Sequence, residues 1–434
     1  MKLILLFRMR WALFYLPVVL YSAMAIWFCA VVLLPLPPSS FVMAVGLPQG
    51  SYTSIANRYR QELETRGINV EIVTTEGASG PLSRLVDPKS EVVAGFASGL
   101  FNNGKWDGVE ALAAIERQPV WVFTRLDKVT QLSQLKGLRI GTAGQGNPGW
   151  AVTQLLLAHV RLGSSDVTLR EAKTYAEAAN DLMDGKVDVA IIVANGEAQA
   201  MRALSRSPGV HMVGVDRISA LMAREPRLRP FVLPQGAIEL RGDVPSRDLT
   251  MLGANLHLLV RDTMHPALQR VLLDTAQKLH EAPSFLQHQG EYPAMHSLDY
   301  SLSPVARQWA AGERPLMEQL LPYGQAQLAE LLLYAVLPIL ILTFFLLAWI
   351  PNFFSWKVNA ILQNHYGELK FLESEIVPSA TTKPMEMVKL MQRLDNIELQ
   401  IATMELPDKY ADRWYTLREH CAQAREKLLS YRAR

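Results

Sequence analysis

Two long apolar runs without charged residues divide this chain of 434 residues, and they constrain its fold more than any other feature. No charged residue occurs from Trp11 up to Arg58, and the stretch 331–350 reads LLLYAVLPILILTFFLLAWI. A helix of about 20 apolar residues crosses the roughly 30 Å hydrocarbon core of a bilayer. The sequence therefore predicts two transmembrane helices, and the segment between them forms a separate domain.

The residues that flank the two runs indicate their orientation. Lys2, Arg8 and Arg10 precede the first run, Lys357 follows the second, and positive charge beside a span tends to stay in the cytoplasm. A cleaved signal peptide is disfavoured, because the first run is long and lacks a small-residue cleavage site at its end. We therefore expect a bacterial inner-membrane protein with both termini cytoplasmic. Its predicted parts are an N-terminus and anchor (1–39), a periplasmic domain (40–328), a second span (329–351) and a cytoplasmic helical tail (352–434).

Composition narrows the possible environments and partners. The two cysteines, Cys29 and Cys421, fall in the first apolar run and in the tail, so the outer domain must fold without a disulfide. The formal net charge is +2, which gives no basic surface for nucleic acid. The bilayer is therefore the one partner that composition predicts.

The outer segment alternates apolar strands with amphipathic helices, and this pattern runs through twice. Alternation of this kind is typical of a parallel α/β sheet, and two successive units predict two lobes with a cleft between them. The first pass predicts strands at 41–47, 70–75, 92–96 and 120–125, with helices at 52–66 and near 81–86. The second pass predicts strands at 138–142, 167–170 and 187–193 and helices at 150–161 and 175–184, continued by 198–204 and 211–215.

Three loops rich in glycine and small hydroxyl residues follow predicted strands and lead into helices. They span residues 46–52, 76–80 and 142–149. In open α/β sheets, ligands bind at the carboxyl ends of the strands, and the N–H groups of a helix N-terminus attract an anion. Glycine also serves simply to make tight turns, but three such loops on one rim favour ligand binding.

The third loop also matches a different motif. Gly144, Gly146 and Gly149 fit the GxGxxG pattern of dinucleotide-binding folds, and Glu171 lies where the ribose-binding acid would be expected. Against this alternative, the unit lies in the middle of the domain, and nicotinamide cofactors are scarce outside the cytoplasmic membrane. The sequence thus predicts no cofactor.

Side chains that carry catalysis or bind metals form no recognisable group in the sequence. Ser79 and Ser98 lack the GxSxG context of a hydrolase nucleophile, and we do not expect an enzyme. The late histidines form no HxxxH or HxxH pair, so we expect solvated or core histidines rather than a metal site. These histidines are His257, His265, His280, His288 and His296.

Two features near residue 120 have more than one interpretation. Trp121 and Phe123 alternate on a predicted strand and are expected in the core. Arg125 follows this strand, where its guanidinium either faces the cleft and pairs with a carboxylate or caps the linker between the lobes.

Several short motifs, taken in order along the chain, resemble one family. They are GLPQGSYTSIA (46–56), VEIVTTEGASG (70–80), RQPVW (117–121), LKGLRIG (135–141) and DGKVDVA (184–190). From about residue 41 to about residue 290, the chain resembles the TAXI-type solute receptors of tripartite ATP-independent periplasmic (TRAP) transporters. The C-terminal span and tail, with YTLREH at 415–420, resemble the membrane-anchored branch of that family.

This resemblance implies a clamshell like that of periplasmic binding proteins, which captures a small organic anion, such as a carboxylate or an amino acid, and delivers it to a sodium-driven TRAP-type permease. Lobe 1 would comprise about 40–125 and 235–328, and lobe 2 about 126–234. Two of its loops differ from the usual family pattern, namely Gly77–Pro81 and Gly144–Asn147. Carried over by position, the solute contacts would be Gly50, Ser51, Tyr52, Gly77, Ala78, Ser79, Gly144, Gln145, Gly146, Asn147 and Asn195, with Arg125 as a further candidate.

Apolar residues of the tail recur at helical spacing before and after Pro407, which predicts an antiparallel hairpin or a short coiled coil, while 358–372 continues the second span inward as a helix. The hairpin either packs on itself and caps the anchor or contacts the permease or a cytoplasmic partner. An alternative function follows from this tail. The chain would then be a transmembrane ligand sensor or scaffold, in which the same clamshell acts through the tail on a cytoplasmic partner.

Overall fold

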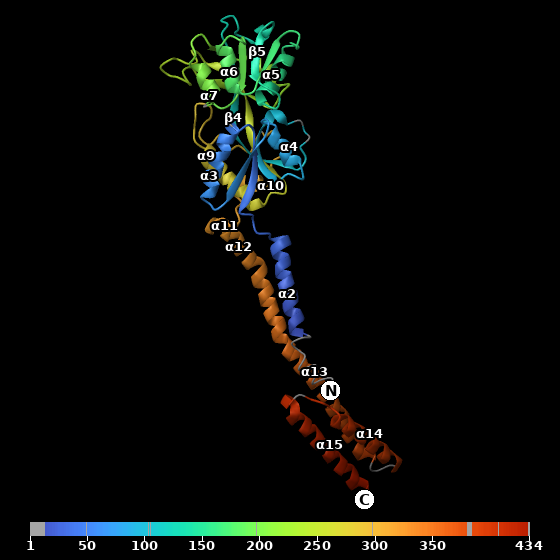
Figure 1. Cartoon of the computed structure of the whole chain (residues 1–434). Helices are drawn as coiled ribbons and strands as arrows, with labels where there is room; N and C mark the ends of the chain where they lie inside the picture. Colours follow the sequence, from blue (N-terminus) through green and yellow to red (C-terminus); the bar gives the residue numbers. More distant parts are fainter. Residues whose placement is uncertain are drawn as a thin grey trace. The chain divides into compact units, whose positions relative to one another are not determined.

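The protein separates into two compact units in the computed structural model (Figure 1). One is Pro37–Gln327, and the other combines Met1–Leu36 with Leu328–Arg434. The structure describes residues 14–432 except Gln49, Asn103, Lys105, Glu197, Ser297, residues 380–383 and Pro407. The flanking residues Lys2, Arg8 and Arg10 and the predicted helix break at Pro407 therefore lie outside the described residues.

The unit Pro37–Gln327 is an α/β domain whose strands join one ten-stranded sheet. Its strands are β1 (Ser40–Val45), β2 (Asn69–Thr74), β3 (Val92–Ser98), β4 (Val109–Thr124), β5 (Arg139–Ala143), β6 (Thr168–Ala172), β7 (Val189–Val193), β8 (His211–Met212), β9 (Leu228–Leu233) and β10 (Leu249–Arg261). Its helices are α3 (Ser51–Glu64), α4 (Gly80–Val86), α5 (Pro148–His159), α6 (Tyr175–Met183), α7 (Gln199–Ser205), α8 (Ile218–Met222), α9 (Pro266–His280), α10 (Pro304–Ala310) and α11 (Leu316–Leu320).

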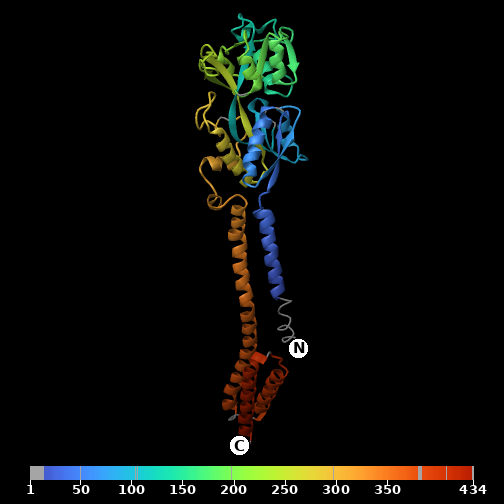
Figure 2. The same ribbon diagram turned by 60° about the vertical axis from the view of Figure 1, so that its left-hand side comes forward.

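The sheet runs continuously through two lobes. Its order is β2-β1-β3-β10-β4-β7-β5-β6, with β8 beside β4 and β9 beside β10. The first part of β4 pairs with β10 in lobe 1, and its last residues, Val120–Thr124, pair with β7 in lobe 2. Figures 1 and 2 both show β4 passing from the lobe of α3 and α9 to the lobe of α5 and α6. The two-lobed α/β fold is therefore confirmed.

The sheet is mixed, whereas the alternation of strands and helices predicted a parallel one. Strands β1, β2 and β3 are parallel in lobe 1, and β5, β6 and β7 are parallel in lobe 2. β10 is antiparallel to both β3 and β4, and β4 is antiparallel to β7. The physical reason is that the chain crosses between the lobes along β4 and returns along β10, so these two strands run in opposite directions.

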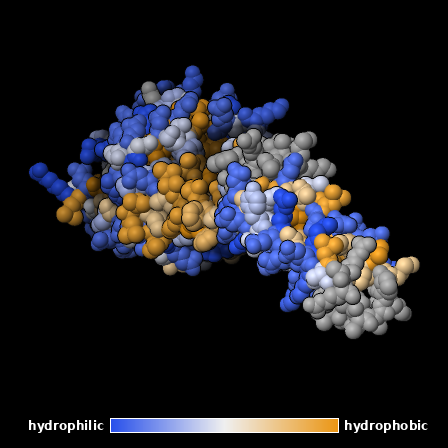
Figure 3. Space-filling model, turned by 90° about the horizontal axis from the view of Figure 1, so that it is seen from below, coloured by the Kyte–Doolittle hydropathy of each residue, from blue (hydrophilic) through white to orange (hydrophobic). Residues whose placement is uncertain are grey.

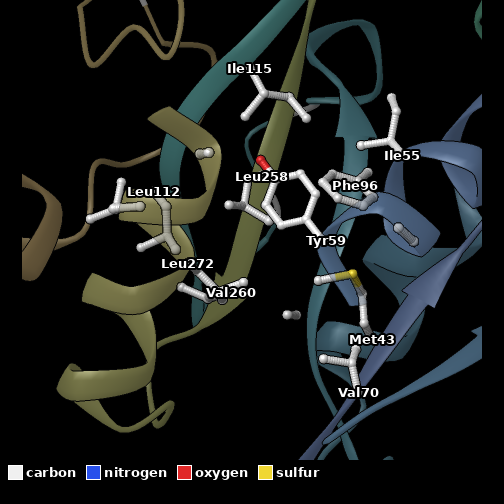
Figure 4. Packing of buried hydrophobic residues seen from close by; sticks show 14 of the residues in the cluster. Met43, Ile55, Tyr59, Val70, Phe96, Leu112, Ile115, Leu258, Val260 and Leu272 are labelled. Atoms are coloured by element: carbon white, nitrogen blue, oxygen red, sulfur yellow. The ribbon is translucent and has the colours of Figure 1, made fainter. Parts of the chain in front are cut away.

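Lobe 1 packs helices on both faces of its sheet. α3 and α9 cover one face, where Tyr59, Phe96 and Leu272 belong to a single buried cluster. Figure 4 shows Tyr59 pointing among Phe96, Leu258 and Met43 in this core. On the other face, Leu82 and Leu85 of α4 join a second cluster. The amphipathic helix predicted at 52–66 thus forms as α3 and holds the first glycine loop at its N-terminus.

Lobe 2 is built in the same way. Leu156 of α5 packs on one face of the sheet, and Leu182 of α6 and Met201 of α7 pack on the other. Trp121 and Phe123 are buried in the second of these clusters, as the sequence predicted. The indole N–H of Trp121 donates to the carbonyl oxygen of Ala194 at 2.9 Å, which ties β4 to the end of β7.

The second unit contains the two apolar segments. α2 (Leu16–Phe28) continues through a π-helical turn (Cys29–Leu33), while α12 (Gln325–Leu331) and a second π-helical turn (Leu332–Val336) lead into α13 (Leu337–Ser379). Leu16–Leu33 and Gln325–Ile376 are both long and apolar enough to cross a membrane. No residue of α2, all of which are described, is buried. Figure 3, a view from below, shows hydrophobic side chains exposed beside hydrophilic surface.

A polar contact joins the two apolar segments. The hydroxyl oxygens of Ser22 in α2 and Thr343 in α13 lie 2.6 Å apart, and each hydroxyl also reaches the carbonyl oxygen four residues earlier. Hydroxyl pairs of this kind link helices in apolar surroundings, where water does not compete for the hydrogen bond.

The tail is a bundle of three helices, in which the predicted helical pair packs against the extension of α13. α13 extends beyond its apolar part, and its residues Leu372 and Ile376 pack with Leu394 of α14 (Pro384–Ala402) and Leu417 of α15 (Ala411–Arg432). Arg425 of α15 forms ion pairs with Asp395 and Glu398 of α14. The helix predicted at 358–372 is present as part of α13, but the prediction did not include its packing against the other two helices.

Candidate functional site

A cavity of about 340 Å³ lies between the two lobes of the α/β unit. Its volume falls at the lower end of the roughly 300–1,000 Å³ that small-molecule sites occupy. The lining residues are mostly small, and they come from the ends of strands and the starts of helices. They are Gly46, Leu47, Gly50, Ser51, Tyr52, Ser54 and Ala78 from lobe 1, and Ala143, Asn147, Pro148, Thr174, Tyr175, Ala176, Val193, Ala194, Ala198, Gln199 and Ala200 from lobe 2.

Four helices point their N-termini at this cavity. The first residues of α3, α5, α6 and α7 are among those that line it. The first amides of a helix have no acceptor within the helix, and the helix dipole adds a partial positive charge at this end. No Lys or Arg is among the described residues that line the cavity. A positive potential in the cavity would therefore have to come from backbone groups.

Local sequence explains why the helices begin here. α5 begins with Pro148 after Asn147, and proline at the first helical position needs no hydrogen-bond acceptor for its nitrogen. α6 begins after Thr174, whose hydroxyl accepts from the backbone N–H of Glu177 at 3.2 Å. α5 begins in the loop after β5 and α6 in the loop after β6, so both helices start at the cavity wall.

Two tyrosines from opposite lobes face the cavity. The Tyr52 hydroxyl donates to the side-chain oxygen of Gln118 on β4 at 3.1 Å, and Gln118 is fully buried. The Tyr175 hydroxyl accepts from the backbone N–H of Gly149 in the first turn of α5 at 2.8 Å. Burial raises the pKa of both hydroxyls, and the nearby Tyr175 further raises that of Tyr52. Both side chains therefore stay neutral and offer hydroxyl groups rather than charge.

The structure brings five of the residues predicted from sequence to the cavity wall, namely Gly50, Ser51, Tyr52, Ala78 and Asn147. Gly144, Gln145 and Asn195 lie in the loops beside it but are not among the described lining residues. The carbonyl oxygen of Asn195 accepts from the N–H of Ala198 at 3.2 Å, in the turn that leads into α7. Gln49, which belongs to the first glycine loop, lies outside the described residues.

Three other predicted residues make contact with each other rather than with the cavity. The backbone N–H of Ser79 donates to the carbonyl oxygen of Gly146 at 3.1 Å, and this bond joins lobe 1 to lobe 2. A Cβ at Gly77 would lie only 3.2 Å from the same oxygen. Two of the three glycine-rich loops thus meet edge to edge.

Arg125 lies at the end of β4 with its guanidinium on the C-terminus of α6. It donates to the carbonyl oxygens of Met183 at 2.7 Å and of Leu182 at 3.5 Å. It is not among the described residues that line the cavity. Arg125 therefore caps α6, rather than the linker between the lobes or a carboxylate in the cleft.

Sequence reasoning missed the part of the wall formed by Thr174–Ala176 and Ala198–Ala200. These segments contain no glycine, which was the signal used to select loops. A usable signal was present nonetheless. Both segments follow strands predicted at 167–170 and 187–193, and the carboxyl ends of strands are where ligands bind in such sheets.

The dinucleotide alternative can be compared with this geometry. The strand–loop–helix context exists, and a Cβ at Gly144 would lie 3.0 Å from a carboxylate oxygen of Glu171. The N–H of Gly149 at the start of α5, however, is taken by Tyr175, and the carbonyl oxygen of Gly146 is taken by Ser79. A pyrophosphate accepts hydrogen bonds from N–H groups, so the occupied Gly149 N–H removes one of its donors, and the structure disfavours this alternative.

The histidines play no part in this cavity. His257 and His280 are buried in lobe 1, where desolvation lowers the pKa of His257 to about 3 and that of His280 to about 4. Among the described residues, no group of three His, Cys, Asp or Glu side chains is placed to hold a metal ion.

Most of the two lobes and of the cavity wall lies in a segment that matches a known protein family. The sequence profile of the NMT1-like family matches residues 51–289, which is more than half of the chain. The chain belongs to the NMT1-like family. The matched segment contains the cavity-lining residues from Ser51 to Ala200. No sequence among curated proteins is similar enough to count as a relative of this family member.

Three solved structures with similarity to this chain are those of binding proteins. An ancestral arginine-binding protein bound to arginine is 14% identical over 57% of this chain and 95% of its own, with a TM-score of 0.37. The substrate-binding protein of an amino acid ABC transporter is 13% identical over 55% and 92%, with a TM-score of 0.36. The aliphatic sulphonate binding protein SsuA from Escherichia coli is 13% identical over 71% and 84%, with a TM-score of 0.34. All three scores are below 0.5, so the assignment rests on the family match.

Proposed function

We propose that this NMT1-like protein is a membrane-tethered extracytoplasmic receptor that captures a small organic anion and delivers it to a TRAP-type permease. One observation carries the proposal, namely the cavity between the lobes with four helix N-termini at its wall. Backbone amides and helix dipoles bind a carboxylate without a cationic side chain. The small lining residues leave room for a compact molecule, such as a keto acid, a dicarboxylate or an amino acid.

The two apolar helices support the tether. Their exposed leucine, valine and phenylalanine side chains find no cover in the protein itself, and a bilayer is the solvent that such helices require. Tethering keeps the receptor close to a permease in the same membrane and so raises their effective concentration. Solute binding would select the closed clamshell, and the closed form would dock on the permease.

A thermal-shift screen of the full chain in lipid nanodiscs tests solute binding. The panel contains dicarboxylates, 2-keto acids, amino acids and nicotinamide dinucleotides. A ligand at about 100 times its dissociation constant adds about 2.7 kcal/mol of stability, which is a clear shift in melting temperature. Stabilisation by a small organic anion supports the proposal. A shift with dinucleotides alone, or with no member of the panel, would count against it.

Delivery to a permease is tested separately. The receptor and a candidate permease are placed together in proteoliposomes, and uptake of the solute identified in the screen is measured with and without a sodium gradient. Sodium-dependent uptake that requires the receptor supports the TRAP assignment. Uptake that ignores the receptor contradicts it.

One observation favours the sensor as a second candidate. α13 is a single helix from Leu337 to Ser379, and its Leu372 and Ile376 belong to the core of the tail bundle. The apolar helix and the bundle are therefore one continuous element, which would transmit a movement of the span. Deleting residues 356–434 separates the two functions. A receptor keeps its solute uptake, whereas a sensor loses its downstream response while solute binding stays intact.

A further inference from the structure

The contact between two glycine-rich loops gives these loops a role other than the one their sequence predicts. The N–H of Ser79 in lobe 1 donates to the carbonyl oxygen of Gly146 in lobe 2 at 3.1 Å. The approach is close because neither Gly77 nor Gly146 has a side chain. A Cβ at Gly77 would lie 3.2 Å from the Gly146 oxygen, and a Cβ at Gly146 would lie 3.2 Å from the Ser79 hydroxyl.

Gly146 also has a backbone conformation that favours glycine. Its φ is +83°, in the left-handed region that other residues adopt only with strain. This conformation directs the Gly146 carbonyl oxygen toward lobe 1, where Ser79 meets it. Both the space and the backbone therefore require glycine at this position.

Each loop is held within its own lobe before it meets the other. The hydroxyl of Thr75 lies 2.8 Å from the carbonyl oxygens of Val45 and Gly77. In lobe 2, the side-chain amide of Asn147 donates to the carbonyl oxygen of Gly144 at 3.1 Å, and the N–H of Gly144 donates to Ala172 at 2.9 Å. Because both loops are fixed locally, the contact between them reports the relative position of the lobes.

The contacting residues alternate with residues of the cavity wall. Ala78 lies between Gly77 and Ser79, and Asn147 follows Gly146, and both Ala78 and Asn147 line the cavity. Gly77, Ser79 and Gly146 themselves are not among the described lining residues. Forming the contact therefore brings two parts of the cavity wall together, while the contacting atoms stay off the solute.

From this arrangement, we infer that Gly77, Ser79 and Gly146 form a latch between the lobes that holds the clamshell closed around its solute. These are positioning residues, because they act on the lobes and not on the solute. Their effect on solute retention rests on the proposed function. The effect on lobe closure does not, and closure can be measured without any solute.

The test uses the full chain in lipid nanodiscs, with Cys29 and Cys421 changed to serine. Spin labels are attached at two exposed positions, through Lys89→Cys in lobe 1 and Arg206→Cys in lobe 2. The distance between the labels is measured by pulsed electron paramagnetic resonance. Two latch variants are compared, Gly77→Val, which places a branched side chain against Gly146, and Gly146→Ala, which strains the loop and approaches Ser79.

Matched controls separate the latch from the general cost of changing a glycine. Gly67→Ala imposes the same backbone strain as Gly146→Ala, since the φ of Gly67 is +77°, but its Cβ would meet nothing within 4 Å. Gly163→Val adds the same branched side chain as Gly77→Val, where the nearest atom is 3.8 Å away. If Gly77→Val fails to fold, Gly77→Ala replaces it, because even a methyl group would press on the Gly146 oxygen.

The latch predicts that both of its variants shift the label distances to longer values, while both controls keep the unaltered distribution. It also predicts that hydrogen exchange at the Ser79 amide becomes about fivefold faster in the latch variants, as expected for loss of one hydrogen bond of about 1 kcal/mol. Latch variants that match their controls in both measurements would overturn the inference. If the latch inference fails but the solute panel still identifies a ligand, the proposed function stands. If the panel identifies no ligand, the proposed function loses support, but the label distances still test the latch.

Discussion

Lobe 1 brings one helix N-terminus to the cavity, that of α3, whereas lobe 2 brings three, those of α5, α6 and α7. The two lobes share the same construction, with parallel strands covered by helices on both faces. They also differ in buried titratable groups, because His257 and His280 both belong to lobe 1. The difference indicates a division of labour. Under the proposed function, lobe 2 would supply most of the helix starts that face the anion, and lobe 1 would close over them and carry the acid sensitivity.

The largest expected effect concerns the acid sensitivity of lobe 1. The folded-state pKa values of His257 and His280 are lowered to about 3 and about 4, so in the folded protein both stay neutral as the pH falls, while the unfolded chain takes up protons. Stability is therefore complete above pH ~6.5 and decreases by about 1.4 kcal/mol per pH unit for each histidine below it. Between pH 7 and pH 5, the two together remove roughly 4 kcal/mol.

Denaturant unfolding of the full chain at pH 7 and pH 5 measures this loss. In a His280→Gln variant, the difference between the two pH values should shrink by about half, since one of two equal contributions is removed. Hydrogen exchange should show α3 and α9 of lobe 1 opening before α5 of lobe 2 at pH 5. If the variant keeps the same pH dependence, or if lobe 2 opens before lobe 1, lobe 1 is not the acid-sensitive lobe.

The next largest effect concerns the cavity wall of lobe 2. Ala176 lies at the start of α6, is exposed and lines the cavity, so Ala176→Trp places an indole ring in the space of the solute. We expect binding of the solute found in the screen to weaken about 100-fold or more, equivalent to about 2.7 kcal/mol. Ser54→Trp, on the lobe 1 wall, should weaken binding less, because Ser54 lies beyond the first turn of α3.

Ala203→Trp serves as the matched control, since Ala203 is an exposed residue of lobe 2 outside the cavity wall. Titration calorimetry compares the three variants with the unaltered chain. Equal losses for Ala176→Trp and Ser54→Trp would remove the distinction between the lobes. An unchanged affinity for both would place the solute elsewhere.

A smaller effect is expected from the tyrosine of lobe 2. Tyr175→Phe removes the hydroxyl that accepts from the N–H of Gly149, which leaves a donor at the start of α5 without its partner. The expected cost is about 1 kcal/mol of unfolding free energy, and the Gly149 amide should exchange faster. Tyr52→Phe in lobe 1 should leave that amide unchanged, because its hydroxyl bonds to Gln118 instead. Faster exchange at Gly149 in both variants would show that the lobes are coupled through the cavity.

The smallest effect is expected at Arg125. Its guanidinium donates to the last carbonyl groups of α6, so Arg125→Ala should cost only about 0.3–1 kcal/mol of stability and leave solute affinity unchanged. Thermal unfolding and titration calorimetry measure the two quantities on the same sample. A tenfold loss of affinity would restore the other role considered for this residue, namely pairing with a solute carboxylate.

The elements within each lobe could be predicted from the sequence because their signal is local. Helices α3, α5 and α6 begin within two residues of the positions that periodicity predicts, and β7 lies inside the predicted strand at 187–193. β10 was not predicted, although it is buried almost throughout. A continuous apolar run shows no alternation of apolar and polar residues, so its sequence does not distinguish a strand from a helix. Without β10, the second crossing between the lobes and the mixed sheet could not be foreseen.

The site was predictable only in part, for a different physical reason. Loops rich in glycine can approach other backbone segments closely, and this property pointed to the loops of both Gly77 and Gly146. It does not say what approaches them, and in this fold each loop approaches the other. Tyr175 and Ala198 line the cavity because pairing of β6 and β7 with β5 brings the loops that follow these strands to one rim. That proximity depends on sheet order, which sequence spacing does not reveal.

Hydrogen exchange of the full chain in nanodiscs, with and without the solute found in the screen, tests the central claim most directly. A solute bound by helix N-termini should slow exchange in the first turns of α3, α5, α6 and α7, with more protection in lobe 2 than in lobe 1, and should protect the Ser79 amide as the lobes close. Protection confined to segments away from these four helix starts, with binding otherwise intact, would contradict the account of the cavity as the solute site.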